Sequence, residues 1–99
     1  MKKMKFEWDI KKDEQNKQKH KVTFPEACLV FADNYSLNLF DNAHSIEDPR
    51  WITMGQIPGG EILVVVHTFR ELPGKEIIRI ISARKASKKE KKQYFARRL

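Results

Sequence analysis

Two dense runs of branched apolar residues lie close together in the second half of the sequence, and they constrain its fold more than any other feature. Residues 62–66 are all valine, isoleucine or leucine, and residues 77–81 are all isoleucine apart from Arg79. Such runs are typical of central strands. Leu72-Pro73-Gly74 between them is a turn sequence, and connections this short join antiparallel strands. The sequence therefore predicts an antiparallel pair at the centre of a sheet.

Two more strands are expected on the N-terminal side of this pair. Residues 36–40 alternate between polar and apolar types, and residues 50–57 form a further extended run. Pro58-Gly59-Gly60 is a turn that leads from this run into the next strand, predicted over residues 61–69. The last strand is predicted over residues 76–82, and the polar residues 41–49 form a loop. These strands make an antiparallel meander of three to four strands.

A polar helix is expected near the N-terminus. Asp9 is a good N-cap for a helix over residues 10–19, and residues 4–9 form a short strand before it. The helix has almost no apolar stripe, so polar contacts must hold it against the rest of the chain. Three polar side chains share one of its faces and are expected to supply a structural polar face: Lys12, Asn16 and His20.

Two capping boxes mark the remaining helices. Thr23 and Glu26 open a second helix with an apolar stripe suited to packing on a sheet. Ser87 and Glu90 open a basic C-terminal helix, in which Tyr94 is an apolar anchor. The order of strand, two N-terminal helices, meander and C-terminal helix predicts an α+β fold.

Composition limits the classes of protein to which the chain can belong. Its 99 residues, numbered 1–99, fit a single domain with a thin core. The one cysteine excludes an internal disulfide, and neither a secretory signal nor an apolar run near the ~20 residues of a membrane span is present. We therefore expect a cytoplasmic protein without membrane contact.

The net charge of +7 is concentrated at the two ends of the sequence. Residues 1–21 and residues 82–99 each hold eight of the 20 basic residues, whereas residues 22–81 hold eight of the 13 acidic ones. Clustered positive charge favours a polyanionic partner such as RNA. For the lysines taken alone, a solvated surface that only aids solubility is the better explanation.

Polar residues interrupt the predicted strands, although motifs of metal sites and of conventional enzymes are absent. The three histidines are far apart and no glycine-rich phosphate loop is present, so neither a metal nor a cofactor is expected. His67 follows the valine run, Arg79 interrupts the isoleucine run, and Arg84 lies just past its end. We expect neighbouring strands to bring these residues together. A histidine near two arginines suits phosphodiester chemistry, because imidazole transfers protons at neutral pH and guanidinium groups stabilise phosphate charge.

These residues also have a purely structural interpretation. His67 and Arg79 could be satisfied sheet residues, with Arg79 paired to Glu7 or Glu61. The predicted loop and its end hold a second candidate cluster, in which Glu47 is a possible base: His44, Ser45, Glu47 and Arg50. Loop solvation and an ion pair between Glu47 and Arg50 would explain that cluster without any function.

The sequence resembles the BrnT family of ribonuclease toxins from residue 6 to residue 95. Three segments carry most of the resemblance: Phe6-Glu7-Trp8-Asp9, Lys19-His20 and Arg79-Ile80-Ile81-Ser82-Ala83-Arg84. Further matching positions are Lys12, Asn16, Val22, Phe24, Glu26-Ala27, Phe31, Asp33, Asp41, His44-Ser45, Glu47, Arg50, Gly55, Val64-Val65-Val66-His67-Thr68, Ala86, Glu90 and Tyr94. Lys21 departs from the family, which usually has glycine there, so this lysine must accept a positive φ or shift the turn. Asp48-Pro49 before Arg50 is also unusual.

The resemblance implies a RelE-like fold and the toxin of a type II toxin–antitoxin system. Such a toxin is a metal-independent endoribonuclease that cuts RNA by attack of the ribose 2′-OH and inhibits translation. A cognate BrnA-like antitoxin neutralises it in a hetero-oligomer, expected to hold two toxins and two antitoxins, and supplies the contact with operator DNA.

The resemblance also implies roles for individual residues. His67 is the candidate general acid or base, and Arg79 and Arg84 are the candidate phosphate stabilisers. Candidates for the substrate-binding rim are His44, Glu47, Arg50 and Tyr94. Two other functions fit the composition: a non-catalytic basic module that binds RNA or the ribosome, and a protein-interaction domain with an acidic partner.

Overall fold

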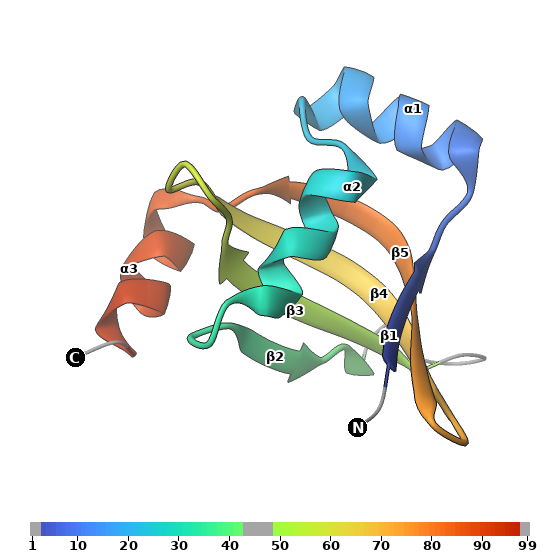
Figure 1. The fold of residues 1–99 in the computed structure, drawn as a ribbon. Helices are drawn as coiled ribbons and strands as arrows, with labels where there is room; N and C mark the ends of the chain where they lie inside the picture. Colours follow the sequence, from blue (N-terminus) through green and yellow to red (C-terminus); the bar gives the residue numbers. More distant parts are fainter. Residues whose placement is uncertain (1–2, 43–48, 98–99) are drawn as a thin grey trace.

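The computed structural model of the chain describes residues 3–42 and 49–97, which form a five-stranded sheet with helices on both of its faces (Figure 1). The elements in chain order are β1 (Lys3–Glu7), α1 (Ile10–His20), α2 (Phe24–Ala27), the 3-10 helix η1 (Cys28–Ala32), β2 (Leu37–Phe40), β3 (Arg50–Gln56), β4 (Ile62–Leu72), β5 (Lys75–Lys85) and α3 (Lys88–Ala96). The predicted α+β order of elements is confirmed. The predicted second helix differs, because it is one turn of α-helix that continues as a 3-10 helix.

The sheet is mixed, with the strand order β1-β5-β4-β3-β2. Strands β2 to β5 are paired antiparallel, as the meander prediction required. Strand β1 adds a fifth strand by pairing parallel to β5, with Glu7 beside Arg79. The long connection through the helices allows β1 to reach the far edge of the sheet in this direction.

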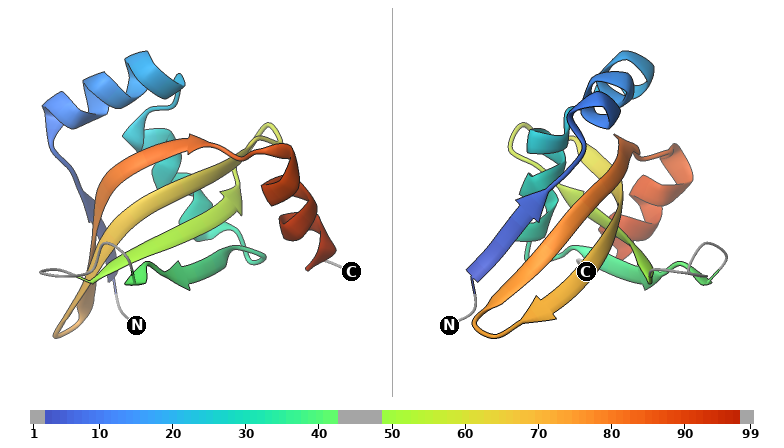
Figure 2. Two further views of the ribbon diagram at one scale, coloured as in Figure 1. Left: turned by 180° about the vertical axis from the view of Figure 1, so that it is seen from behind. Right: turned by 90° about the vertical axis from the view of Figure 1, so that its right-hand side faces the viewer.

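One face of the sheet, here called the helical face, is covered by α1, α2 and η1 (Figure 2). Val22, Phe24 and Val30 are almost fully buried there against the central strands. The strand residues that complete this core cluster are Leu63, Val65, Ile78, Ile80 and Ala83. Each fully buried side chain of this size contributes roughly 1.5–3 kcal/mol, so this layer holds much of the stability of the fold.

On the opposite face, here called the open face, α3 is the only described helix, and it covers one end (Figure 2). Tyr94 of α3 packs there against Met54, Ile62 and Val64. Beyond α3, Ile52 and Val66 are half-buried, and the side chain of Leu39 is 55% exposed. Part of the open face is therefore available for a partner that spreads over a sheet.

A bulge in β5 decides which side chains reach the open face. Val66 pairs with Ser82 and His67 with Ile80, which leaves Ile81 as an extra residue. In a regular strand Arg79 and Arg84, five positions apart, would point to opposite faces. Their neighbours Ile80 and Ala83 both belong to the core of the helical face, so the bulge places both arginines on the open face.

Buried polar contacts hold the polar helix α1. Asn16 is buried, its Nδ2 donates to the carbonyls of Val22 (2.9 Å) and Ala83 (2.8 Å), and its Oδ1 accepts from the Ala83 N–H (3.1 Å). Of the other two residues expected on this polar face, Lys12 is exposed and His20 is half-buried. Lys21 ends the helix at φ 60°, so of the two alternatives expected for this lysine it adopts the left-handed conformation.

Candidate functional site

His67 lies on the helical face, in the interior of the protein. Its side chain is 5% exposed, and its ring meets that of Phe31 of η1 edge-on, with 4.9 Å between the centroids. Nε2 lies 2.7 Å from Thr53 Oγ1, which in turn donates to Asn38 Oδ1 at 2.6 Å. Burial lowers the pKa of His67, which favours the neutral ring. The residue has the environment of a hydrogen-bonded core histidine.

The structure separates His67 from Arg79 and Arg84 by the thickness of the sheet. Thr68, not His67, is paired with Arg79 across β4 and β5, and successive residues of a strand point to opposite faces. The expectation that the three residues come together is therefore wrong. β4 and β5 do lie side by side over these segments. However, His67 pairs with Ile80, so its side chain points to the helical face, whereas Arg79 points to the open face.

A cavity of about 220 Å³ adjoins His67 on the helical face. Its lining is mostly aromatic or aliphatic: Phe31, Asn38, Trp51, His67, Phe69 and Ile78. No lysine or arginine among the described residues lines it, so these residues offer no cation to a phosphate group there.

On the open face, Arg79 forms a loose cluster with residues from three strands. Glu7 Oε1 of β1 accepts from Arg70 Nη2 of β4 at 3.2 Å and lies 3.7 Å from Arg79 Nη1 of β5. The Arg79 side chain is 47% exposed, and that of Glu7 is 36% exposed. Thr68 separates Arg79 from Arg50 in the same cross-strand row. Since neighbouring strands are ~4.8 Å apart, this end of the open face brings three arginines and one carboxylate into a small area.

The structural interpretation of Arg79 expected it to pair with either Glu7 or Glu61, and the structure shows the pair with Glu7. This pair does not remove the guanidinium group from use, because an exposed ion pair with a 3.7 Å separation is weak and can be exchanged for another anion. Sequence reasoning considered Glu7 only as a partner of Arg79 and overlooked Arg70. Side chains two positions apart in a strand point to the same face, so Arg70 shares a face with Thr68. This alternation could have placed Arg70 beside Arg79 from the sequence.

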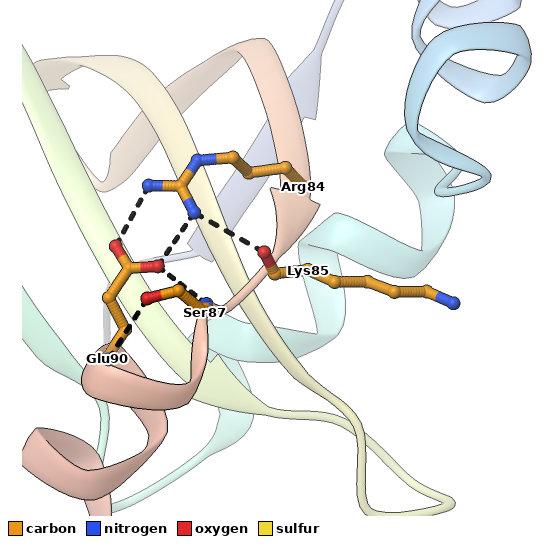
Figure 3. Close-up of polar contacts among 4 residues, drawn as sticks. All are labelled: Arg84, Lys85, Ser87 and Glu90. Atoms are coloured by element: carbon orange, nitrogen blue, oxygen red, sulfur yellow. Dashed lines mark hydrogen bonds and ion pairs between the residues drawn. The ribbon is translucent and has the colours of Figure 1, made fainter.

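Arg84 is held much more firmly than Arg79. Its Nη1 and Nη2 donate to the two carboxylate oxygens of Glu90 at 2.8 and 2.9 Å (Figure 3). Glu90 also accepts from the Ser87 N–H and completes the predicted capping box of α3. Arg84 lowers the pKa of Glu90 to about 2, and Glu90 raises the pKa of Arg84. Arg84 thus fastens the start of α3 to the end of β5.

The structure places the other expected rim residues as follows. Tyr94 is fully buried and its hydroxyl donates to Asp33 Oδ2, which corrects the prediction of an exposed rim residue. Arg50 is half-buried at the start of β3. His44, Ser45 and Glu47 lie outside the described residues.

Other chemistry finds little support among residues 3–42 and 49–97. No group of three or more histidine, cysteine, aspartate or glutamate side chains there could hold a metal ion. Burial raises the pKa of the Cys28 thiol to about 11, so little thiolate is present at neutral pH. None of the helices in this part of the chain has the length and apolar character needed to cross a bilayer.

Comparison with known proteins decides the family. A family model described as the ribonuclease toxin BrnT of type II toxin–antitoxin systems matches residues 8–90. The chain belongs to the BrnT family. Membership makes it a ribonuclease toxin with an RNA substrate and a cognate antitoxin. The curated protein sequences contain no significant match.

The fold agrees with that of a BrnT protein of known structure. The crystal structure of the Brucella abortus ribonuclease toxin BrnT, at 1.1 Å resolution, superposes with a TM-score of 0.62 at 24% sequence identity. The match covers 86% of this chain and 99% of the Brucella chain. The comparison therefore supports the BrnT fold from the N-terminal strand to the C-terminal helix.

Proposed function

We propose that this BrnT-family toxin is an endoribonuclease that cuts RNA without a metal ion and thereby arrests translation. In this proposal the 2′-OH of a ribose attacks the adjacent phosphate and leaves a 2′,3′-cyclic phosphate end. One observation carries it: Arg79, Arg70 and Glu7 meet on an accessible part of the open face. Guanidinium groups in such a position can bind a phosphodiester and stabilise the charge that develops during its cleavage.

The shape of the open face supports RNA as the ligand. A sheet surface covered only at one end can receive an extended single strand, whose unstacked bases and phosphates are both accessible. Arg79 and Arg84 are separated by five positions along β5, which corresponds to about 15 Å. We therefore propose that the reacting phosphate binds at Arg79, whereas Arg84, which both oxygens of Glu90 already hold, keeps α3 attached.

The proposed roles of the other residues follow from their environment. Arg50 lies in the same cross-strand row as Arg79 and would extend the basic surface. His67 is 5% exposed on the helical face, so we assign it a packing role behind β4 in place of the general acid or base role. His44 and Glu47 remain candidates for the rim.

We further propose that residues 1–99 act as one domain and that a BrnA-like antitoxin blocks the open face. The complex would contain two toxins and two antitoxins, and the antitoxin would contact operator DNA. The net charge of +7 supports an antitoxin segment rich in acidic residues, because such a segment competes with RNA for the same cations.

The test is to incubate the purified protein with a defined RNA in the presence of EDTA and to map the new ends. The proposal expects 2′,3′-cyclic phosphate and 5′-hydroxyl ends, together with reduced amino-acid incorporation when the protein is expressed without its antitoxin. Lys17→Ala, which removes one positive charge from α1, should cut at the wild-type rate. Salt-dependent RNA binding without new ends would contradict the proposal and favour a non-catalytic RNA-binding module.

A further inference from the structure

We propose that Glu7 is the general base of the cleavage reaction, a role that rests on the ribonuclease function proposed above. Glu7 is the last residue of β1, and the parallel pairing of β1 with β5 sets it beside Arg79 on the open face. Its carboxylate is accessible, with the side chain 36% exposed. The reacting phosphate and a proton acceptor would then be held by adjacent residues of two strands.

The charges around Glu7 suit this role. Among residues 3–42 and 49–97, two groups face its carboxylate: Arg70 from β4, 3.2 Å away, and Arg79 from β5, 3.7 Å away. Both can also bind a phosphodiester, so an RNA phosphate that binds the two guanidinium groups would lie next to the Glu7 oxygens. The ribose 2′-OH adjacent to that phosphate would then be within reach of the carboxylate.

The proposed step is balanced without a metal or a cofactor. Glu7 takes the proton of the 2′-OH while the bond from O2′ to phosphorus forms and the bond from phosphorus to O5′ breaks. The leaving O5′ takes a proton from water, which gives a 2′,3′-cyclic phosphate and a 5′-hydroxyl end. The hydroxide that remains takes the proton from Glu7, which restores the carboxylate and water. Arg79 and Arg70 offset the negative charge that builds up on the phosphate oxygens.

Two other carboxylates that interact with arginines of β5 are less suited to the same step. Asp9 Oδ1 accepts from the N–H groups of Lys11 and Lys12 and so caps α1. Glu90 is bound through both oxygens by Arg84 and also caps α3. In contrast, Glu7 has no cap to maintain, and its contacts with arginine are exposed and longer. Such pairs add little to stability, so stability alone gives a weak reason for its position.

The experiment compares single-turnover cleavage of a defined oligoribonucleotide by the wild type, by Glu7→Gln and by the matched control Glu61→Gln. Glu61 is also a partly exposed glutamate in a surface ion pair, 3.6 Å from Lys85. Because a positioned general base contributes typically 10²–10⁴-fold, Glu7→Gln should cut about 100- to 10,000-fold more slowly. Its RNA affinity should not fall, and Glu61→Gln should resemble the wild type in both measurements.

The pH dependence of the rate separates a base from a residue that only positions Arg79. With Glu7 as the base, the wild-type rate falls at acidic pH because the carboxyl group becomes protonated, and Glu7→Gln loses this acidic limb. Wild-type cleavage by Glu7→Gln, a retained acidic limb, or a loss confined to RNA affinity would each overturn the assignment. If the wild type itself makes no cyclic phosphate ends, the ribonuclease mechanism fails instead.

Discussion

The open face carries two arginine–carboxylate pairs that differ in almost every physical respect. Arg84 and Glu90 form two hydrogen bonds of 2.8 and 2.9 Å, and Glu90 also caps α3. Arg79 and Glu7 are 3.7 Å apart, and Glu7 shares its oxygen with Arg70. Both arginines belong to the segment from Arg79 to Arg84, one of the three segments that carry most of the resemblance to the BrnT family.

The two arginines of β5 therefore suit different roles, one in holding the structure together and one in binding a ligand. A guanidinium group bound in parallel through two hydrogen bonds is fixed in place, and its charge is already compensated. A guanidinium group in a long, exposed ion pair can exchange its partner for a phosphate at little cost. We therefore assign the chemistry to the Arg79 end of the open face and the attachment of α3 to the Arg84 end.

The largest expected effect is that of Arg79→Ala on activity. Losing one preorganised donor to a developing negative charge typically costs 10²–10³ in rate, so expression of this variant should no longer arrest growth. Stability should change by less than about 1 kcal/mol, because the lost ion pair is exposed. Growth after induction and a thermal unfolding curve measure the two effects. Growth arrest of wild-type strength by the variant would place the chemistry elsewhere.

The next largest effect is that of His67→Ala, which should affect stability and not cleavage because His67 lies on the helical face. His67→Ala should lower the free energy of unfolding by about 2–4 kcal/mol, because it leaves a hole beside Phe31 and removes the partner of Thr53. Cleavage per folded molecule should stay within a few-fold of the wild type. Denaturant unfolding and a cleavage assay at low temperature provide the comparison. A folded His67→Gln variant that binds RNA but does not cut it would restore the histidine to the active site.

His67 also gives the stability a pH dependence of known sign. Burial lowers its pKa from 6.5, so its unfolded form binds a proton more readily than the folded form does. The stability from the neutral ring is present above about pH 6.5 and is lost as the pH falls through the lower pKa of the folded state. His67→Gln should lose part of this dependence, which unfolding measurements between pH 7 and pH 5 can detect.

The smallest effect concerns the firmly held pair. Arg84→Ala should destabilise the protein by about 1 kcal/mol after allowance for solvent screening, with cleavage close to normal while α3 stays docked. Because Arg84 lowers the pKa of Glu90 from 4.5 to about 2, this contribution is present above about pH 4.5 and lost as the pH falls towards 2. Equal loss of stability on acidification in the wild type and the variant would contradict this interpretation of the pair.

Local sequence signals were sufficient for most of the fold. The capping boxes at Thr23 and Ser87 confirm two predicted helix starts, and the apolar runs became the central strands β4 and β5. Strand β1 was expected at the N-terminus, but its parallel pairing with β5 joins residues about 70 positions apart. No local pattern encodes such a contact, because it depends on how the helices between the strands pack.

The candidate site was harder to predict, because it depends on strand parity. The alternation of side chains would put Arg79 and Arg84 on opposite faces, and only the bulge at Ile81 unites them. The register of β4 and β5 pairs Thr68 with Arg79, so His67 points to the helical face and is buried there. A shift of one residue would exchange the two faces. The resemblance implied a rim position for Tyr94, but its hydroxyl group binds Asp33 in the interior.

The central claim is that RNA is cut at the Arg79 end of the open face and not at the Arg84 end. The most direct measurement is the rate at which 2′,3′-cyclic phosphate ends form on one defined RNA, compared at a temperature where the wild type, Arg79→Ala and Arg84→Ala are all folded. The account predicts a rate at least about 100-fold below the wild type for Arg79→Ala and a rate within a few-fold of it for Arg84→Ala. Equal losses in the two variants, or the larger loss in Arg84→Ala, would contradict it.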